Sequence, residues 1–340
     1  MHLTLLVPEL LWPEPADQAA WEGLALPGLA WLLGRAPCER QPALPYEHAL
    51  AAAWGRGADA PLAALRLLGE QAPGALTPGD ACWLCADPVH LRFHHERVVL
   101  ADAGAFELAA QEAVELVAAL NREFADLGSF HALTPRRWLL RLARPVAFAT
   151  PPLSAVAGRR LDRGQAASPL QSVLNEIQMV LHGHPVNEAR AARGLPAVNG
   201  LWLWGAGALG DAPPAPFACL HADDPLAQGL ARSAAVQALP LPAGLDALLA
   251  AAPAERAIAV LDAPLSAVLY EDSARWRAIL AGLDAAWFAP AARALGRLKS
   301  LTLLAPTVYG ALAWRLEAGA RWRFWRRPAD LAALARSLAA

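Results

Sequence analysis

The sequence contains almost no lysine: Lys299 is the single lysine among 29 basic residues, and all the others are arginines. The basic residues are nearly balanced by 31 acidic residues, which leaves a formal net charge of −2. Proteins that bind nucleic acid usually carry a basic face, so this balance predicts that nucleic acid is not a partner. Codon bias is sufficient to explain the excess of arginine, although arginine also suits forked contacts with anions.

Long uninterrupted hydrophobic runs are also missing, although hydrophobic residues make up 56% of the chain. The most apolar run, residues 301–314, contains Pro306 and is shorter than the roughly 18–20 apolar residues that span a bilayer. The first residues lack the basic stretch that precedes the apolar segment of a signal peptide. We therefore expect a cytoplasmic protein with no membrane partner.

Cysteine is scarce, and four residues are too few for a disulfide framework in a chain of this length. Cys82 and Cys85 have the CxxC spacing of some zinc and redox sites. No second pair of Cys or Cys/His residues nearby would complete a four-ligand zinc site. Because both residues flank a short apolar run, the pattern favours two buried thiols.

The spacing of apolar residues predicts an α/β protein. Short apolar runs indicate strands at residues 3–7, 81–84, 98–100, 138–142, 201–204, 258–261 and 301–304. Helical spacing predicts helices at 26–33, 61–68, 106–124, 169–182 and 275–283, the fourth beginning with Ser168 as N-cap and Pro169 as first residue. Strands that alternate with helices favour a mostly parallel sheet covered on both faces.

A late segment, residues 321–326, alternates arginine with aromatic residues except where Phe324 and Trp325 are adjacent. Alternation places successive side chains on opposite faces of a strand. The segment is therefore predicted to be an edge strand whose arginines face solvent.

The most distinctive segment reads His-Pro-Val-Asn at 184–187, Gly-Leu-Pro-Ala-Val-Asn at 194–199 and Trp-Gly-Ala-Gly at 204–207. It resembles the segment by which archaeal-type cofactor-independent phosphoglycerate mutases, of the alkaline phosphatase superfamily, leave an inserted domain and re-enter their core. Residues 78–86 resemble the strand that opens that insert. Residues 261–284 resemble a late ligand segment and the helix after it. The arrangement is also similar to a small bacterial group of RpfE-type regulatory proteins.

The resemblance implies both a fold and a domain division. The fold is an alkaline-phosphatase-like three-layer α/β core with a mostly parallel sheet, plus a smaller inserted α/β domain. The core would comprise residues 1–77 and 200–340, and the insert residues 78–199.

The resemblance also implies two divalent metals and a Ser or Thr nucleophile, and this chain departs from that pattern at four places. Where the family has Asp-Gly after the first strand, residues 7–9 read Val-Pro-Glu, and the nucleophile position falls in Tyr-Glu-His at 46–48. The late Asp-Glu-x-x-His is replaced at 265–269, and the final Asp-His is replaced by Ala-Pro-Thr at 305–307. We therefore expect no catalytic residues, no metal cofactor, and a regulatory or ligand-binding role.

Candidate ligand contacts remain in and beside the inserted domain. Their cationic, imidazole and amide side chains would suit a phosphorylated small acid: His184, Asn187, Arg190, Arg193, Asn199, His90 and Arg92. For the histidines at 90, 94 and 95, solvated or hydrogen-bonded surface positions are the alternative to an anion or metal site. For His184, Asn187 and Asn199 the alternative is that they hold loop backbone.

Two other functions stay open. An active phosphomutase or phosphatase would need an unrecognised site for Mn, Zn or Mg, and the weak cluster His221, Asp223, Asp224 and Asp262 would supply it; a turn before Pro225 is the structural alternative. A protein-interaction scaffold would instead use exposed members of the thirteen tryptophans as a partner surface.

Overall fold

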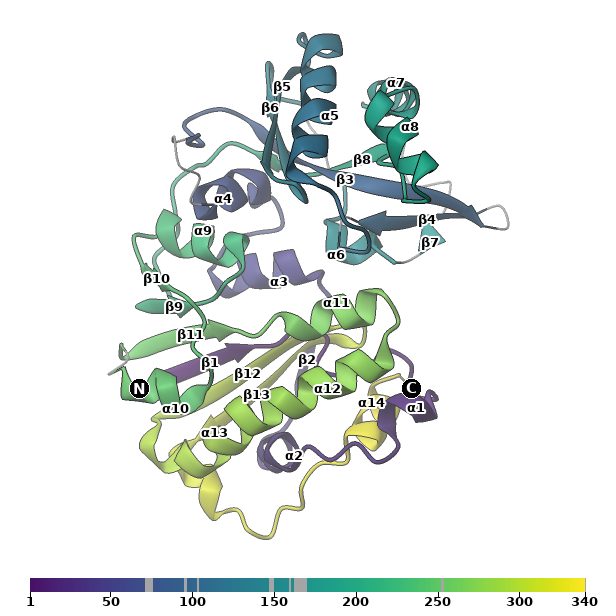
Figure 1. Cartoon of the computed structure of the whole chain (residues 1–340). Helices are drawn as coiled ribbons and strands as arrows, with labels where there is room; N and C mark the ends of the chain where they lie inside the picture. The colour runs from purple at the N-terminus through teal and green to yellow at the C-terminus, as the bar shows by residue number, and fades with distance from the viewer. Residues whose placement is uncertain are drawn as a thin grey trace. The chain divides into compact units, whose positions relative to one another are not determined.

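The computed structural model describes residues 1–70, 76–94, 97–102, 104–146, 150–158, 160–161, 170–251 and 254–339. They form two compact units (Figure 1). Unit 1 comprises Met1–Arg56 and Ala212–Ala340, and unit 2 comprises Gly57–Asp211. Unit 2 therefore includes residues on both sides of the predicted insert at 78–199.

Unit 1 is built on a mixed, seven-stranded sheet in the order β10-β9-β11-β1-β12-β13-β2. The strands are β1 (His2–Leu6), β2 (Glu39–Gln41), β9 (Cys219–His221), β10 (Gln237–Leu239), β11 (Arg256–Val260), β12 (Ser300–Thr307) and β13 (Gly310–Glu317). The five strands from β10 to β12 in that order are parallel, whereas β13 and β2 are antiparallel to their neighbours. The predicted mostly parallel sheet is confirmed.

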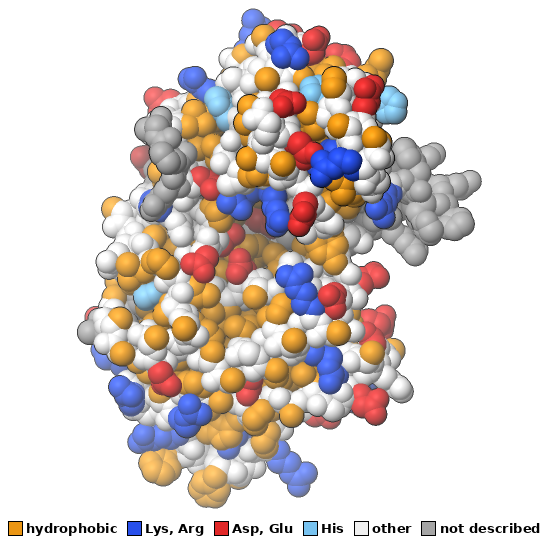
Figure 2. Space-filling view, in the orientation of Figure 1, with side chains coloured by type: hydrophobic (Ala, Val, Ile, Leu, Met, Phe, Trp, Pro, Cys, Tyr) orange, Lys and Arg blue, Asp and Glu red, His pale blue; other side chains and the backbone are white. Residues whose placement is uncertain are grey.

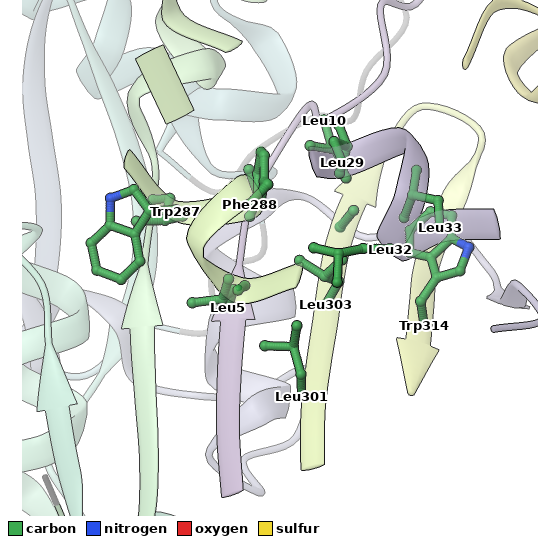
Figure 3. Close-up of a cluster of buried hydrophobic side chains, with 14 of the residues drawn as sticks. Leu5, Leu10, Leu29, Leu32, Leu33, Trp287, Phe288, Leu301, Leu303 and Trp314 are labelled. Atoms are coloured by element: carbon green, nitrogen blue, oxygen red, sulfur yellow. The ribbon is translucent and has the colours of Figure 1, made fainter. Parts of the chain in front are cut away.

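The helices of unit 1 follow the strands in alternation. They are α1 (Gln18–Trp21), α2 (Pro27–Gly34), α3 (Tyr46–Ala53), α9 (Pro225–Ser233), α10 (Leu245–Ala250), α11 (Ala263–Leu269), α12 (Ser273–Leu283), η1 (Asp284–Phe288), α13 (Ala289–Ala294), η2 (Leu295–Arg297), η3 (Ala318–Trp322) and α14 (Leu331–Ala339). Leucines of β1 and β12 pack against α2 and η1, as Figure 3 shows for Leu5, Leu303, Leu29 and Phe288. This apolar layer fixes α2, α12, η1 and α13 on one face of the sheet.

Helix α2 is held on its neighbours by a buried carboxylate and a small residue. Asp284 of η1 accepts hydrogen bonds from the backbone N–H of Gly28 (3.1 Å) and Leu29 (2.7 Å). These are two of the donors that a helix N-terminus leaves without intrahelical partners. A Cβ on Gly28 would lie 2.3 Å from the backbone nitrogen of Ala289, so the close approach requires glycine.

The helical stretch from Ser273 to Arg297 is long and apolar enough to cross a membrane by length and composition alone. Among the described residues, no other helix meets that criterion. Trp276, Leu280, Trp287 and Phe288 of this stretch are buried in the core of unit 1.

Unit 2 is built on a six-stranded antiparallel sheet. Strands β5-β6-β3-β4-β7 follow one another in that order, and β8 also pairs with β3. The strands are β3 (Trp83–His94), β4 (Arg97–Asp102), β5 (Gly128–Thr134), β6 (Arg137–Leu142), β7 (Arg160–Leu161) and β8 (Gly200–Gly207). The helices are α4 (Leu62–Gly69), α5 (Ala110–Glu123), α6 (Leu153–Val156), α7 (Gln171–His182) and α8 (Pro185–Ala192). The predicted N-cap of α7, Ser168, and Pro169 lie outside the described residues.

Two predicted elements are wrong in their placement. Residues 201–204 were expected in the parallel sheet, but β8 pairs antiparallel with the long strand β3 of unit 2. Residues 321–326 were expected to form an edge strand, but η3 and a turn occupy them. The β12–β13 pairing ends at Ser300 and Glu317, so the chain beyond Glu317 has no strand beside which to continue.

Candidate functional site

The edge of unit 1 where the parallel strands end is the place to look for a site, because open α/β sheets bind ligands beyond the carboxyl ends of their strands. Strands β9, β11, β1 and β12 are neighbours and parallel, so the loops that follow them meet at one edge. These loops carry Glu9 after β1, Asp223 and Asp224 after β9, and Asp262 after β11. Thr307 ends β12.

The loop after β1 has an unusual backbone. Glu9 has a φ of 52°, in the left-handed region that glycine enters at the least cost. The backbone N–H groups of Val7 and Glu9 donate to the carbonyls of Leu304 and Pro306, which ties the loop to β12. Pro8, between them, has neither a carboxylate nor a backbone N–H to offer a ligand.

Aromatic side chains close this half of the edge. The indole N–H of Trp276 donates to the carbonyl of Glu9 at 2.9 Å, and its ring packs 5.5 Å from that of Trp12 between centroids. The Tyr309 hydroxyl donates to the carbonyl of Trp12 at 2.7 Å. The Thr307 hydroxyl donates to the carbonyl of Gly310. The backbone of Glu9 after β1 and the hydroxyl of Thr307 at the end of β12 are therefore engaged in hydrogen bonds within unit 1.

The other half of the edge is acidic. Tyr46, the first residue of α3, is buried. Burial is the main cause that raises the pKa of its hydroxyl well above 10, and the charges of Asp224, Asp262 and Glu47 raise it further. A phenolate here would face three carboxylates, so the hydroxyl keeps its proton at neutral pH. Tyr46 therefore lacks the activated oxygen that nucleophilic catalysis requires.

The carboxylates on this side serve the fold. Asp224 caps α9 by accepting from the N–H of Ala227 at 2.7 Å, and Asp223 accepts from the N–H of Leu241 at 3.1 Å. His221 is buried with its Nε2 3.6 Å from the Cys219 sulfur. The ranges that the structure describes contain no group of three or more His, Cys, Asp or Glu side chains arranged to hold a metal. The cluster of His221, Asp223, Asp224 and Asp262 thus does not form one metal-holding group, and these residues do not fit a two-metal centre.

Asp262 is expected to make the stability of this edge depend on pH. Burial, and then the charge of Asp223, raises the pKa of Asp262. Between the unfolded and folded pKa values the native state holds a proton that the unfolded state has lost, so stability falls as pH rises through this window. Asp262→Asn is expected to raise the Tm of unit 1 at neutral pH, and the gain is expected to vanish below the unfolded pKa of about 3.9.

Thermal unfolding across this pH range checks the prediction. Asp246→Asn, at an exposed position in the first turn of α10, is the control and should not raise the Tm at neutral pH. A lower Tm for Asp262→Asn at neutral pH would contradict it.

In unit 2, Asn187 holds the loop that follows α8. Its amide donates to the carbonyls of Leu181 (2.7 Å) and Val198 (2.8 Å), and its carbonyl accepts from the Val198 N–H at 2.8 Å. The residue is buried. These bonds are what the structural alternative for Asn187 predicts, and its ligand contact stays a prediction.

Arg190 is buried, and its guanidinium makes hydrogen bonds to three different residues. It donates to Glu112 at 2.5 Å, to the carbonyl of Pro196 at 2.8 Å and to the carbonyl of Glu107 at 2.7 Å. Arg193, one turn later, is exposed and lies 3.6 Å from the same Glu112 carboxylate. Of these two arginines, Arg193 is therefore the one that solvent and a dissolved anion reach.

The remaining candidates lie at two places in unit 2. His184 caps α8, with its Nδ1 3.2 Å from the N–H of Val186. Asn199 bonds both backbone groups of Leu91, and His90 lies 2.7 Å from the carbonyl of Ala197, so these two residues tie β3 to the loop before β8. Arg92 is exposed on β3. The side chain of His94 and all of His95 lie outside what the structure describes.

One buried ionic cluster was missed in the sequence. Arg66 of α4 makes two hydrogen bonds of 2.8 Å to Asp87 of β3, and Asp87 also accepts from the Trp204 indole at 2.9 Å and from the Trp138 N–H at 3.1 Å. The available signal was a single arginine in an otherwise apolar helix, Leu62–Gly69. Such a residue needs a buried partner.

The Cys82–Cys85 pair lies at the start of the same strand. Cys85 is buried in β3, Cys82 is partly buried just before it, and neither residue is in a disulfide. The prediction of a strand here is confirmed.

An apolar pocket of about 400 Å³ lies elsewhere in unit 1, between residues 21–30 and 329–332. Trp21, Leu24, Leu26 and Leu331 line it, and Asp330 is the charged residue of its wall. Because the wall has no cation, the pocket does not suit a phosphorylated acid.

Comparisons with known proteins give a fold relation. No family model matches the chain, and no curated protein matches it. Among solved structures, it is similar to a cofactor-independent phosphoglycerate mutase from Thermoplasma acidophilum, with a TM-score of 0.50, 15% identity, and coverage of 97% of this chain and 93% of that one. It is also similar to the PH0037 protein from Pyrococcus horikoshii, with a TM-score of 0.55, 12% identity, and coverage of 97% and 91%. At these identities the likeness shows the fold alone, and it confirms the predicted fold class.

Proposed function

We propose that this chain is a non-catalytic relative of the cofactor-independent phosphoglycerate mutases that acts as a regulatory or ligand-binding protein. The observation that supports it best is the composition of the strand-end edge of unit 1. Pro8 follows the strand where the resemblance calls for a metal-binding Asp, and Glu9 has the left-handed backbone expected of the Gly after it. The backbone at Glu9 is one that glycine adopts at the least cost, whereas Pro8 supplies no carboxylate for a metal.

The position of the nucleophile supports the same proposal. Tyr46 is buried among carboxylates that raise the pKa of its hydroxyl, and no serine or threonine replaces it in residues 46–48. Phosphoryl transfer needs positive charge to stabilise the transferring group. The groups around Tyr46 supply negative charge instead.

The ligand we propose is a phosphorylated small acid that binds unit 2. Arg193 and Arg92 are the exposed cations among the predicted contacts. His184 is a half-buried imidazole at the start of α8, the helix that ends at Arg193. Arginine suits phosphate because its planar fork donates two parallel hydrogen bonds. Asn187, Arg190, Asn199 and His90 would then hold the surrounding loops rather than the ligand.

One observation favours a second function, an active phosphomutase with a divergent metal site. Asp223 and Asp262 interact electrostatically, and Asp224 and Asp262 both act on Tyr46. A divalent metal binds such oxygen ligands. Because the described carboxylates do not form a metal-holding group as they lie, this function would require them to rearrange when metal is added.

Metal analysis and turnover assays separate the two functions. We expect the purified chain to carry no stoichiometric Mn, Zn or Mg, and to show neither phosphatase nor phosphoglycerate mutase activity when these metals are added. The Thermoplasma acidophilum mutase, assayed in parallel, is the positive control. Chelator-sensitive turnover that Asp262→Ala abolishes would overturn the non-catalytic proposal.

The ligand arm of the experiment uses phosphoglycerate as the probe. It is expected to raise the Tm of the chain, and Arg92→Gln/Arg193→Gln is expected to remove that rise. Arg144→Gln, at an exposed arginine elsewhere in unit 2, should leave it unchanged. An equal shift in all three proteins would show that these arginines do not hold the ligand.

A further inference from the structure

The segment that follows β13 presents the exposed aromatic side chains of unit 1. Trp322, Phe324 and Trp325 are 65%, 81% and 67% exposed. In the part of the chain that the structure describes, every other Trp and Phe side chain is buried or partly buried. Eleven of the thirteen tryptophans thus follow the usual rule, and the two exceptions lie in this one segment.

The same segment is strongly basic. Residues 318–329 contain four arginines, at 321, 323, 326 and 327, and no acidic residue. Helix η2, which packs against η3, adds the exposed Arg297, and α13 adds the exposed Arg293. Figure 2 shows arginine and hydrophobic side chains together at the end of unit 1 where Figure 1 draws this yellow segment. The patch therefore combines apolar rings with positive charge in a chain whose net charge is −2.

The backbone of the segment is anchored at both ends. Arg323 donates to the carbonyl of Arg35 at 2.7 Å, and the N–H of Ala329 donates to the carbonyl of Ala30 at 2.8 Å. Gly34 has its α-carbon so near the carbonyl of Arg327 that a Cβ would lie 2.2 Å from this oxygen. The rings are consequently held outward by a fixed loop, and they do not pack back onto the unit.

We propose that residues 321–327 form a docking surface for the anionic surface of a lipid membrane. Tryptophan prefers the headgroup region, where its apolar ring and its polar N–H are both satisfied, and phenylalanine adds an apolar ring at the boundary with the acyl chains. The arginines lie among the rings, where they can pair with lipid phosphates and carboxylates. This surface is separate from the strand-end edge and does not depend on the proposed function. The sequence-based expectation that the chain has no membrane partner becomes testable through this proposal.

The shape of the patch favours lipid over the other anionic partners. A folded acidic protein would have to offer three matching pockets for rings that are 65–81% exposed, whereas lipid headgroups rearrange around them. Single-stranded nucleic acid binds aromatic side chains that line a basic groove tracking its backbone. The rings here protrude, and the basic stretch is confined to one short loop.

Co-sedimentation of the full chain with vesicles tests the proposal. We expect binding to vesicles of phosphatidylcholine mixed with phosphatidylserine, weaker binding to phosphatidylcholine alone, and weakening by salt. Phe324→Ala/Trp325→Ala and Arg326→Gln/Arg327→Gln are each expected to lower the partition coefficient at least about tenfold. These four side chains have no described contacts with the rest of unit 1, so circular dichroism and Tm should match those of the parent.

Matched surface changes in unit 2 provide the controls. Val114→Ala/Met179→Ala removes exposed apolar side chains, and Arg122→Gln/Arg144→Gln removes exposed charge, so each should stay within about twofold of the parent. Equal binding by the parent and Phe324→Ala/Trp325→Ala would overturn the proposal. So would failure to bind either vesicle, with binding to oligo(dT) or polyglutamate instead, which would assign the surface to nucleic acid or to an acidic protein.

Discussion

Asp87→Ala is expected to lower the free energy of unfolding of unit 2 by about 3–5 kcal/mol. Asp87 is buried, and it accepts two hydrogen bonds from Arg66 and one each from the Trp138 backbone and the Trp204 indole. Burial alone would lower the pKa of Arg66. The charge of Asp87 and its hydrogen bond, together with the electrostatic contributions of Cys85 and Glu70, outweigh burial, so the net shift is upward. Removal of Asp87 therefore leaves a charged guanidinium buried without its counterion.

Hydrogen exchange of the β3 and β6 amides in increasing urea reports this loss within unit 2. Asp87→Asn, which keeps the acceptor oxygen and removes the charge, should cost less than Asp87→Ala. The control is Asp126→Ala, at an exposed carboxylate of the same unit, with an expected effect within about 0.5 kcal/mol. A loss below about 1 kcal/mol for Asp87→Ala would mean that water reaches Arg66 and that the cluster is not structural.

Trp276→Ala is expected to destabilise unit 1 by about 3–5 kcal/mol. Its ring is fully buried between those of Trp12 and Trp21, with centroid distances of 5.5 Å to each, and its N–H bonds the carbonyl of Glu9. The substitution removes the packing that covers the end of β1 and leaves a cavity there. Urea denaturation with protection of the β1 and β11 amides as the readout measures the change.

Two further variants separate packing from hydrogen bonding at this position. Trp276→Phe keeps much of the apolar volume and loses the hydrogen bond, so it should cost less than Trp276→Ala. Trp322→Ala removes the same side chain from an exposed position and should change stability by no more than about 0.5 kcal/mol. Equal effects of Trp276→Ala and Trp322→Ala would contradict the structural role assigned to Trp276.

The elements that could be predicted from the sequence are those whose pattern is local. The runs at 3–7, 258–261 and 301–304 are β1, β11 and β12, and the apolar spacing at 26–33 is α2. The run at 201–204 is also a strand, but its apolar pattern suits burial in either sheet. Its partner is β3, whose length lets one strand pair with β6, β4 and β8, and a pattern within 201–204 carries no information about that pairing.

For the strand-end edge of unit 1, the sequence could predict only that residues expected of metal ligands and of a nucleophile are absent. The absence of Asp at 8 and of Ser or Thr at 46–48 is visible in the printed chain. That Trp276 covers the β1 loop is not, because the contact joins residues at opposite ends of the sequence and depends on how α12 lies on the sheet.

The sequence by itself determined the α/β class, most strand and helix positions, and the four departures from the motif pattern that it resembles, because residue identity and short-range periodicity carry these properties. Only the tertiary structure decided which polar side chains form hydrogen bonds within the fold and which aromatic rings face solvent. Asn187 and Arg190, two of the predicted ligand contacts, bond loop carbonyls, and Trp325, predicted in an edge strand, is exposed in a turn. Hydrogen-bond partners and burial are set by segments distant in the chain, so they exist only once those segments have packed together.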